Sequence, residues 1–194
     1  MIKDRHDITN MTNSIVILFS IFVILVIGSF TGAEDKIGTL INAASAGDLE
    51  KIKSLLEEGI DVNAQDDRGF TPLMRAGARG HPDVVKFLLK SGADINAKAH
   101  NGDTALLLAC GGGGVEVVKI LIDNGADINV QDNGGKSCLM IPSWTGQIDV
   151  LKLLLKNGAP VNVKDKDGKT ALMWATEQGQ NQAVELLKAY GAKE

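Results

Sequence analysis

Apolar and polar positions along this chain repeat with a period of 33 residues that begins near residue 40. Leucine returns at the same point of each period in two separate series, and glycine returns in three more. A fixed period of this length indicates similar units that stack, because one unit alone cannot bury its apolar face. The leucine series are Leu40, Leu73, Leu106, Leu139, Leu172 and Leu55, Leu88, Leu121, Leu154, Leu187; the glycine series begin at Gly47, Gly59 and Gly69.

The unit from Asp66 to Lys98 predicts a turn followed by two short helices. Thr71 has the side chain of a helix N-cap, and Pro72 fits the first helical position, where a missing N–H costs nothing. We expect this helix to run to about residue 79 and to end at Gly80. A second helix begins near Pro82, and its apolar residues follow helical spacing until Gly92 closes it.

The stretch GFTPLMRAGARGHPDVVKFLLKSGADINAK, which lies in this unit, resembles the ankyrin repeat. The family pattern is roughly G-x-T-P-L-H-x-A-A-x-x-G-H-x-x-V-V-x-L-L-L-x-x-G-A-D-V-N-A. The resemblance implies an all-α solenoid of helix-turn-helix units with β-turn fingers and a concave face, preceded here by one apolar N-terminal helix. A repeat domain over 34–194 would then hold five units, with bounds 33–65, 66–98, 99–131, 132–164 and 165–194.

Four consecutive glycines follow Cys110 and raise the question of a phosphate-binding loop. Such a loop needs a Lys-Ser/Thr pair after its glycines, and this chain has Val115-Glu116 there instead. In the 33-residue register Gly113 matches Gly47 and Gly80. We therefore expect the run to form the corner between two helices and to be looser than the other corners.

Two departures from the family pattern predict local changes. The histidine that normally follows Thr-Pro-Leu is replaced in every unit by an apolar residue, so apolar packing should replace its hydrogen bonds. Pro142 falls inside the expected first helix of the fourth unit, where it cannot donate to the carbonyl of Cys138. We expect that helix to be kinked or shortened. The five replacements of the histidine are Ile41, Met74, Leu107, Met140 and Met173.

The N-terminal 33 residues differ from the rest. No charge occurs from Ile8 to Ala33, a run of 26 residues. This length lies between a signal-peptide core and a membrane-spanning helix. Lys3 and Arg5 precede the run, so the positive-inside rule places the repeat domain outside the cytoplasm. Two alternatives stay open: a membrane anchor through residues 14–33, or a signal peptide cleaved near Ala33 that leaves a periplasmic or secreted domain.

Charge and composition narrow the function. The net charge of −4 gives no electrostatic reason to expect a nucleic-acid partner. Cys110 and Cys138 have neither zinc-site nor Cys-x-x-Cys spacing, and we interpret them as small buried side chains, although export would permit a disulfide. His81 occupies the structural Gly-His position of the family. We expect no enzyme, no catalytic residues, no metal and no cofactor.

Binding of a partner protein is the predicted function, with a structural or self-associating envelope role as the alternative. By the family register, the turn tips and the exposed side of each first helix form the concave face. Both tryptophans fall there, beside apolar residues, while arginines gather toward the N-terminal half. The candidate partner-binding residues are Arg68, Phe70, Arg75, Arg79, Leu108, Lys136, Ile141, Trp144, Lys169 and Trp174.

Overall fold

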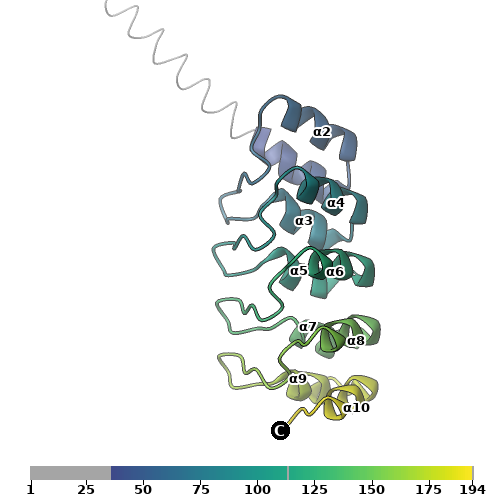
Figure 1. The fold of residues 1–194 in the computed structure, drawn as a ribbon. Helices are drawn as coiled ribbons and strands as arrows, with labels where there is room; N and C mark the ends of the chain where they lie inside the picture. The colour runs from purple at the N-terminus through teal and green to yellow at the C-terminus, as the bar shows by residue number, and fades with distance from the viewer. Residues whose placement is uncertain (1–35, 113, 194) are drawn as a thin grey trace, which may run out of the picture.

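The computed structural model describes residues 36–112 and 114–193. Figure 1 shows pairs of antiparallel helices stacked one behind another from the N-terminal to the C-terminal end, with extended turns projecting on one side. Among the described residues, secondary structure is helical except for one bridge between Gln131 and Ser137. The predicted all-α solenoid is therefore confirmed.

Each pair holds a first helix next to the turns and a second helix behind it (Figure 1). First helices pack on first helices of the next pair, as α3 does on α5, and second helices pack on second helices, as α4 does on α6. The described residues 36–46 are helical and precede α2 (Leu49–Glu57). The later pairs are α3 (Pro72–Arg79) with α4 (Pro82–Lys90), α5 (Ala105–Gly112) with α6 (Gly114–Asp123), α7 (Met140–Thr145) with α8 (Ile148–Lys156), and α9 (Ala171–Glu177) with α10 (Asn181–Ala189).

The first helices begin as the Thr-Pro motif predicts. The Thr71 hydroxyl accepts a hydrogen bond from the Met74 N–H at 3.3 Å, and Pro72 occupies the first helical position. Thr170 caps α9 through the Met173 N–H at the same distance. These caps satisfy N–H groups that have no partner inside the helix.

The proline in the fourth unit shortens its first helix, as predicted. α7 begins at Met140, two residues later than the position equivalent to Pro72. Pro142 thus lies in the first turn, where its missing N–H would have had no intrahelical partner. The Ser143 hydroxyl donates to the Leu139 carbonyl at 2.6 Å, which adds a bond to the shortened turn.

A single apolar cluster runs through the stack and contains both leucine series. The residues that replace the family's histidine also join the interior: Met74 and Met140 are buried, and Met173 is half-buried. The methionine sulfurs accept backbone N–H groups, from Thr71 to Met74 and from Ser137 to Met140. Packing replaces the histidine, as expected, and weak sulfur hydrogen bonds accompany it.

Side chains at one register position tie each pair to the pair before it. His81 Nε2 lies 2.9 Å from the Ser45 carbonyl oxygen, which supports the structural role expected for this histidine. Gln147 and Gln180 make the equivalent bonds, to the carbonyls of Gly111 and Trp144. The fourth residue at this position is Gly114, which has no side chain to make such a bond.

The glycine run forms the corner between α5 and α6, as expected. Gly114 has a left-handed φ of +71°, which a residue with a side chain rarely adopts. Gly113, which the register predicts at the corner itself, lies outside the described residues.

Residues 1–35 also lie outside the described residues. The predicted N-terminal apolar helix, the anchor through residues 14–33 and the cleavage near Ala33 fall there. In the part of the chain that the structure describes, no helix is both long and apolar enough to cross a membrane.

Candidate functional site

The surface formed by the turn tips and by the exposed sides of the first helices is here called the concave face, the family's name for it. One row of this face comes from residues 33 apart on α3, α5, α7 and α9. These are Arg75, Leu108, Ile141 and Trp174, and all four are half-buried. A guanidinium thus begins the row toward the N-terminal end, and apolar groups continue it.

A carboxylate at the base of the turn fixes each end of this row. Asp66 Oδ1 accepts the N–H groups of Arg68 and Phe70, both at 2.9 Å, and its Oδ2 accepts Arg75 Nη2 at 2.9 Å. Ninety-nine residues on, or three periods later, Trp174 Nε1 donates to Asp165 Oδ2 at 2.9 Å. The indole and the guanidinium therefore occupy equivalent places and are held by equivalent carboxylates.

The sequence analysis missed this pairing between turn and helix. The signal was present, because Arg75 follows Asp66 and Trp174 follows Asp165 at the same spacing of nine residues. The consequence for binding is direct. The polar edge of Trp174 is already bonded, so the free part of its ring offers an apolar contact.

These bonds also set the ionisation of the two carboxyl groups. Burial acts to raise the pKa of Asp66, but the Phe70 N–H, the Arg75 guanidinium and the Arg68 N–H outweigh it, and the pKa lies below its ordinary value. The pKa of Asp165 is lowered in the same way against burial, by the Lys169 N–H, the Trp174 indole and the Asp167 N–H. Both groups are therefore structural anions at neutral pH.

Phe70 lies between two guanidinium groups at the N-terminal end of the concave face. The guanidinium carbon of Arg75 is 4.2 Å from the centre of the Phe70 ring, and that of Arg68 is 5.2 Å away. Cation–π contact of this kind holds a guanidinium in place while leaving its N–H groups available. Arg79 is exposed at the end of α3.

The lysines among the candidate residues differ in what they contact. Lys136 Nζ lies 5.7 Å from the Trp174 ring centre and thus covers part of that ring. Lys169 pairs with Glu177, with its Nζ 2.7 Å from Oε1. Its hydrogen bond to Glu177 is the main cause that raises the pKa of Lys169. A partner would have to displace Glu177 to reach this lysine.

Trp144 is the most exposed aromatic side chain of the predicted patch, with 46% of its surface accessible. It lies on α7, one turn beyond Ile141. Gly111 leaves room beside Ile141, since a methyl group placed there would lie 3.5 Å from Ile141 Cγ2. Neither tryptophan is fully buried, so the condition on which the binding hypothesis depended is met.

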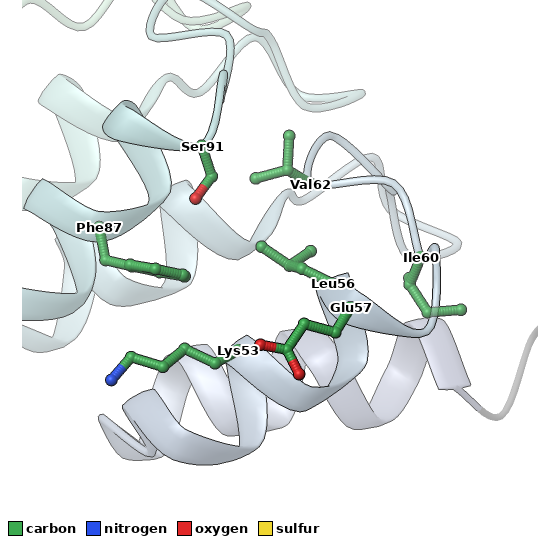
Figure 2. A pocket seen from close by; sticks show the side chains of 7 residues that line it. All are labelled: Lys53, Leu56, Glu57, Ile60, Val62, Phe87 and Ser91. Carbon is green, nitrogen blue, oxygen red and sulfur yellow. The ribbon is translucent and has the colours of Figure 1, made fainter.

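A second hollow lies on the opposite side of the stack, between α2 and α4, and its volume is about 450 Å³. Leu56, Ile60, Val62 and Phe87 give it an apolar wall, and Lys53 and Glu57 stand on its rim (Figure 2). Sequence analysis did not find it. Its signal is Ile60, which stands where the later units have alanine.

Chemistry-bearing side chains are used in the fold. No three His, Cys, Asp or Glu residues of the described chain form a group that could hold a metal ion. Asp61, Asp94 and Asp127 accept the backbone N–H two residues on, which confirms the backbone role expected for them.

Cys110 and Cys138 are buried free thiols. Hydrogen bonding to Cys138 and then burial raise the pKa of Cys110, which makes this thiol a poor nucleophile.

Family models for ankyrin repeats match the chain over residues 19–99 and 98–165, and another ankyrin-repeat model matches residues 143–188. The chain belongs to the ankyrin-repeat family. The resemblance in the sequence is thereby confirmed, and the first match also reaches into the apolar N-terminal segment. A search of curated proteins finds no match. Ankyrin repeats generally mediate protein–protein interaction, which directs attention to the concave face.

Proposed function

We propose that this ankyrin-repeat protein is a non-catalytic interaction module whose concave face binds a partner protein. The observation that carries the proposal is the exposed Trp144 next to Ile141, with Trp174 one repeat further on. Aromatic anchors flanked by apolar residues are typical of the energetically dominant centre of an interface. The same face carries arginines at its N-terminal end, so it offers both apolar and charged contacts to one ligand.

We further propose that the repeat domain spans 34–194 and divides into five units with the bounds given above. Each pair of helices falls within one such unit, which supports this division. The uncharged segment 14–33 supports an anchor in the membrane, or a signal peptide that is removed. In either case the partner is a protein of the compartment outside the cytoplasm.

The test compares the full-length protein, kept in solution with a non-ionic detergent, with two single variants. Trp144→Ala removes the exposed anchor of the concave face. Tyr190→Ala is the matched control, because Tyr190 is another exposed aromatic residue, at the end of α10, and is 49% accessible. Each protein is used as bait for the membrane and secreted fractions of its source, and retained proteins are identified by mass.

We expect one protein to be retained by the unaltered chain and by Tyr190→Ala, and to be lost from a folded Trp144→Ala variant. Equal retention by all three baits would place the interface elsewhere. If nothing is retained and the protein's own mass in solution is that of an oligomer, the self-associating structural role replaces the proposal.

A further inference from the structure

The N-terminal end of the concave face contains a hollow of about 320 Å³ in which positive charge is concentrated. Arg68, Arg75 and Arg79 line it, and Asp66 is the one carboxylate among its lining residues. The hollow thus carries two more positive than negative charges, whereas the whole chain has a net charge of −4. Such a local reversal of charge indicates a site for a negatively charged ligand.

Two of the three guanidinium groups lack a counter-ion in the described part of the chain. Arg75 is paired with Asp66, but the ion pairs found among the described residues include neither Arg68 nor Arg79. Arg79 lies in the last turn of α3, where the helix dipole stabilises a cation. The fold therefore tolerates this charge without using it for a bond of its own.

The hollow is also arranged for hydrogen bonding. Phe70 holds the Arg68 and Arg75 side chains over its ring, which reduces the freedom they would lose on binding. Asn42 and Ser45, from the helix of residues 36–46, complete the wall and add side-chain donors. Guanidinium groups bind carboxylates with two parallel N–H···O bonds, which gives both affinity and orientation.

We propose that this hollow binds the carboxylates of an acidic segment of the partner protein. The inference rests on the proposed function and names the chemistry of the ligand. The segment would place its Asp or Glu side chains against Arg68 and Arg79, and its following apolar residues along Leu108 and Ile141. The charged and apolar parts of the concave face would then serve one continuous ligand.

A protein ligand fits the face better than a nucleic acid does. Nucleic-acid binding needs a positive surface that extends along the phosphate backbone. Here the positive charge is confined to one hollow, and the row continues with Leu108, Ile141 and Trp174. The exposed turn residues Asp67 and Asp167 would also repel phosphates at both ends of the stack.

The test measures the fluorescence anisotropy of labelled peptides with the full-length protein. Two twelve-residue peptides share one sequence of Gly, Ser and Leu and carry either four Glu or four Gln. The variant R68Q/R79Q removes the two uncompensated charges, and K156Q/K188Q removes two exposed lysine charges from α8 and α10 as a matched control. A labelled single-stranded oligonucleotide is the third probe.

We expect the Glu peptide to bind at least about fivefold more tightly than the Gln peptide, with an affinity that falls as salt is added. R68Q/R79Q should lose about five- to tenfold in affinity, in line with two partly exposed ion pairs. K156Q/K188Q should stay within about twofold of the unaltered protein. Absence of Glu-peptide binding, equal binding of both peptides, or an unaffected R68Q/R79Q variant would overturn the inference. Tighter binding of the oligonucleotide that depends on the same arginines would also overturn it.

The same variants separate this inference from the proposed function. A natural partner that is lost from Trp144→Ala but retained by R68Q/R79Q would leave the concave face as the interface and refute the acidic segment. Loss from R68Q/R79Q as well, together with selective binding of the Glu peptide, is the outcome we predict.

Discussion

Alanine substitutions at Gly111 and Gly112 should change the stability of the protein in opposite directions, although the two positions are neighbours in α5. Glycine within a helix is less favourable than alanine by about 0.5–1 kcal/mol. A methyl group at Gly111 would contact only the Ile141 side chain, at 3.5 and 3.8 Å. These are ordinary van der Waals distances, so Gly111→Ala should stabilise the protein by about 0.5–1 kcal/mol.

A methyl group at Gly112 would instead lie 2.7 Å from the carbonyl oxygen of Ala78 in α3. Neither backbone can retreat without separating α3 from α5, and overpacking of this kind costs about 1–3 kcal/mol. The cost exceeds the gain in helix propensity, so Gly112→Ala should be less stable than the unaltered protein. Gly112 is thus required by the close approach of two helices, while Gly111 is not.

Thermal unfolding followed by far-ultraviolet circular dichroism tests the pair, with urea unfolding as an independent measure. For a domain of this size 1 kcal/mol corresponds to about 2–4 °C, so the midpoint should rise by up to about 4 °C for Gly111→Ala and fall for Gly112→Ala. The reasoning would be refuted if both variants were stabilised equally, because α3 and α5 could not then approach as closely as the structure has them.

Three further predictions concern other parts of the stack. Asp66 and Asp165 have a lowered pKa when folded, so the stability they contribute is present above their ordinary value of 3.8 and is lost as pH falls through the folded value; Asp165→Asn should therefore unfold with a flatter pH dependence between about pH 5 and 2 in acid titrations, and a slope parallel to that of the unaltered protein would contradict this. A methyl group built on Gly77 lies 3.9 Å from Ala105 Cβ, and the same pair one period later is Cys110 and Cys138, so oxidised glutathione should join the two thiols with loss of two hydrogens, measurable by mass; two thiols that can still be alkylated after denaturation would contradict it. Because α7 starts late, the Ile141 amide should exchange with solvent at least about tenfold faster than the Arg75 amide, and equal protection in a hydrogen-exchange experiment would count against the shortened helix.

The repeat period predicted the fold in detail because the same local signals recur in every unit. Thr71 and Pro72 define a helix start from neighbouring residues alone, and the leucine series mark positions that face the interior of the stack. The shortened α7 was also predictable, since the cause is the covalent geometry of Pro142. Its outcome needed the structure: the helix moves its start until the proline falls in the first turn.

The candidate site was less predictable because it depends on contacts between units. Register placed Arg75 and Trp174 at equivalent positions, but only the structure shows that Asp66 and Asp165 hold them. Lys169 looked free in the sequence, yet Glu177 neutralises it from the next helix. The positive hollow likewise needs Arg68, Arg75 and Arg79 from one unit to meet Asn42 and Ser45 from the unit before.

The central claim is that a partner protein binds the concave face. Its most direct test is hydrogen exchange of the full-length protein with and without the partner identified by the Trp144 comparison. We predict that binding slows exchange at the turn tips and along α3, α5, α7 and α9, while α4, α6, α8 and α10 keep their free-state rates. Protection confined to the second helices, including the hollow between α2 and α4, would contradict the claim.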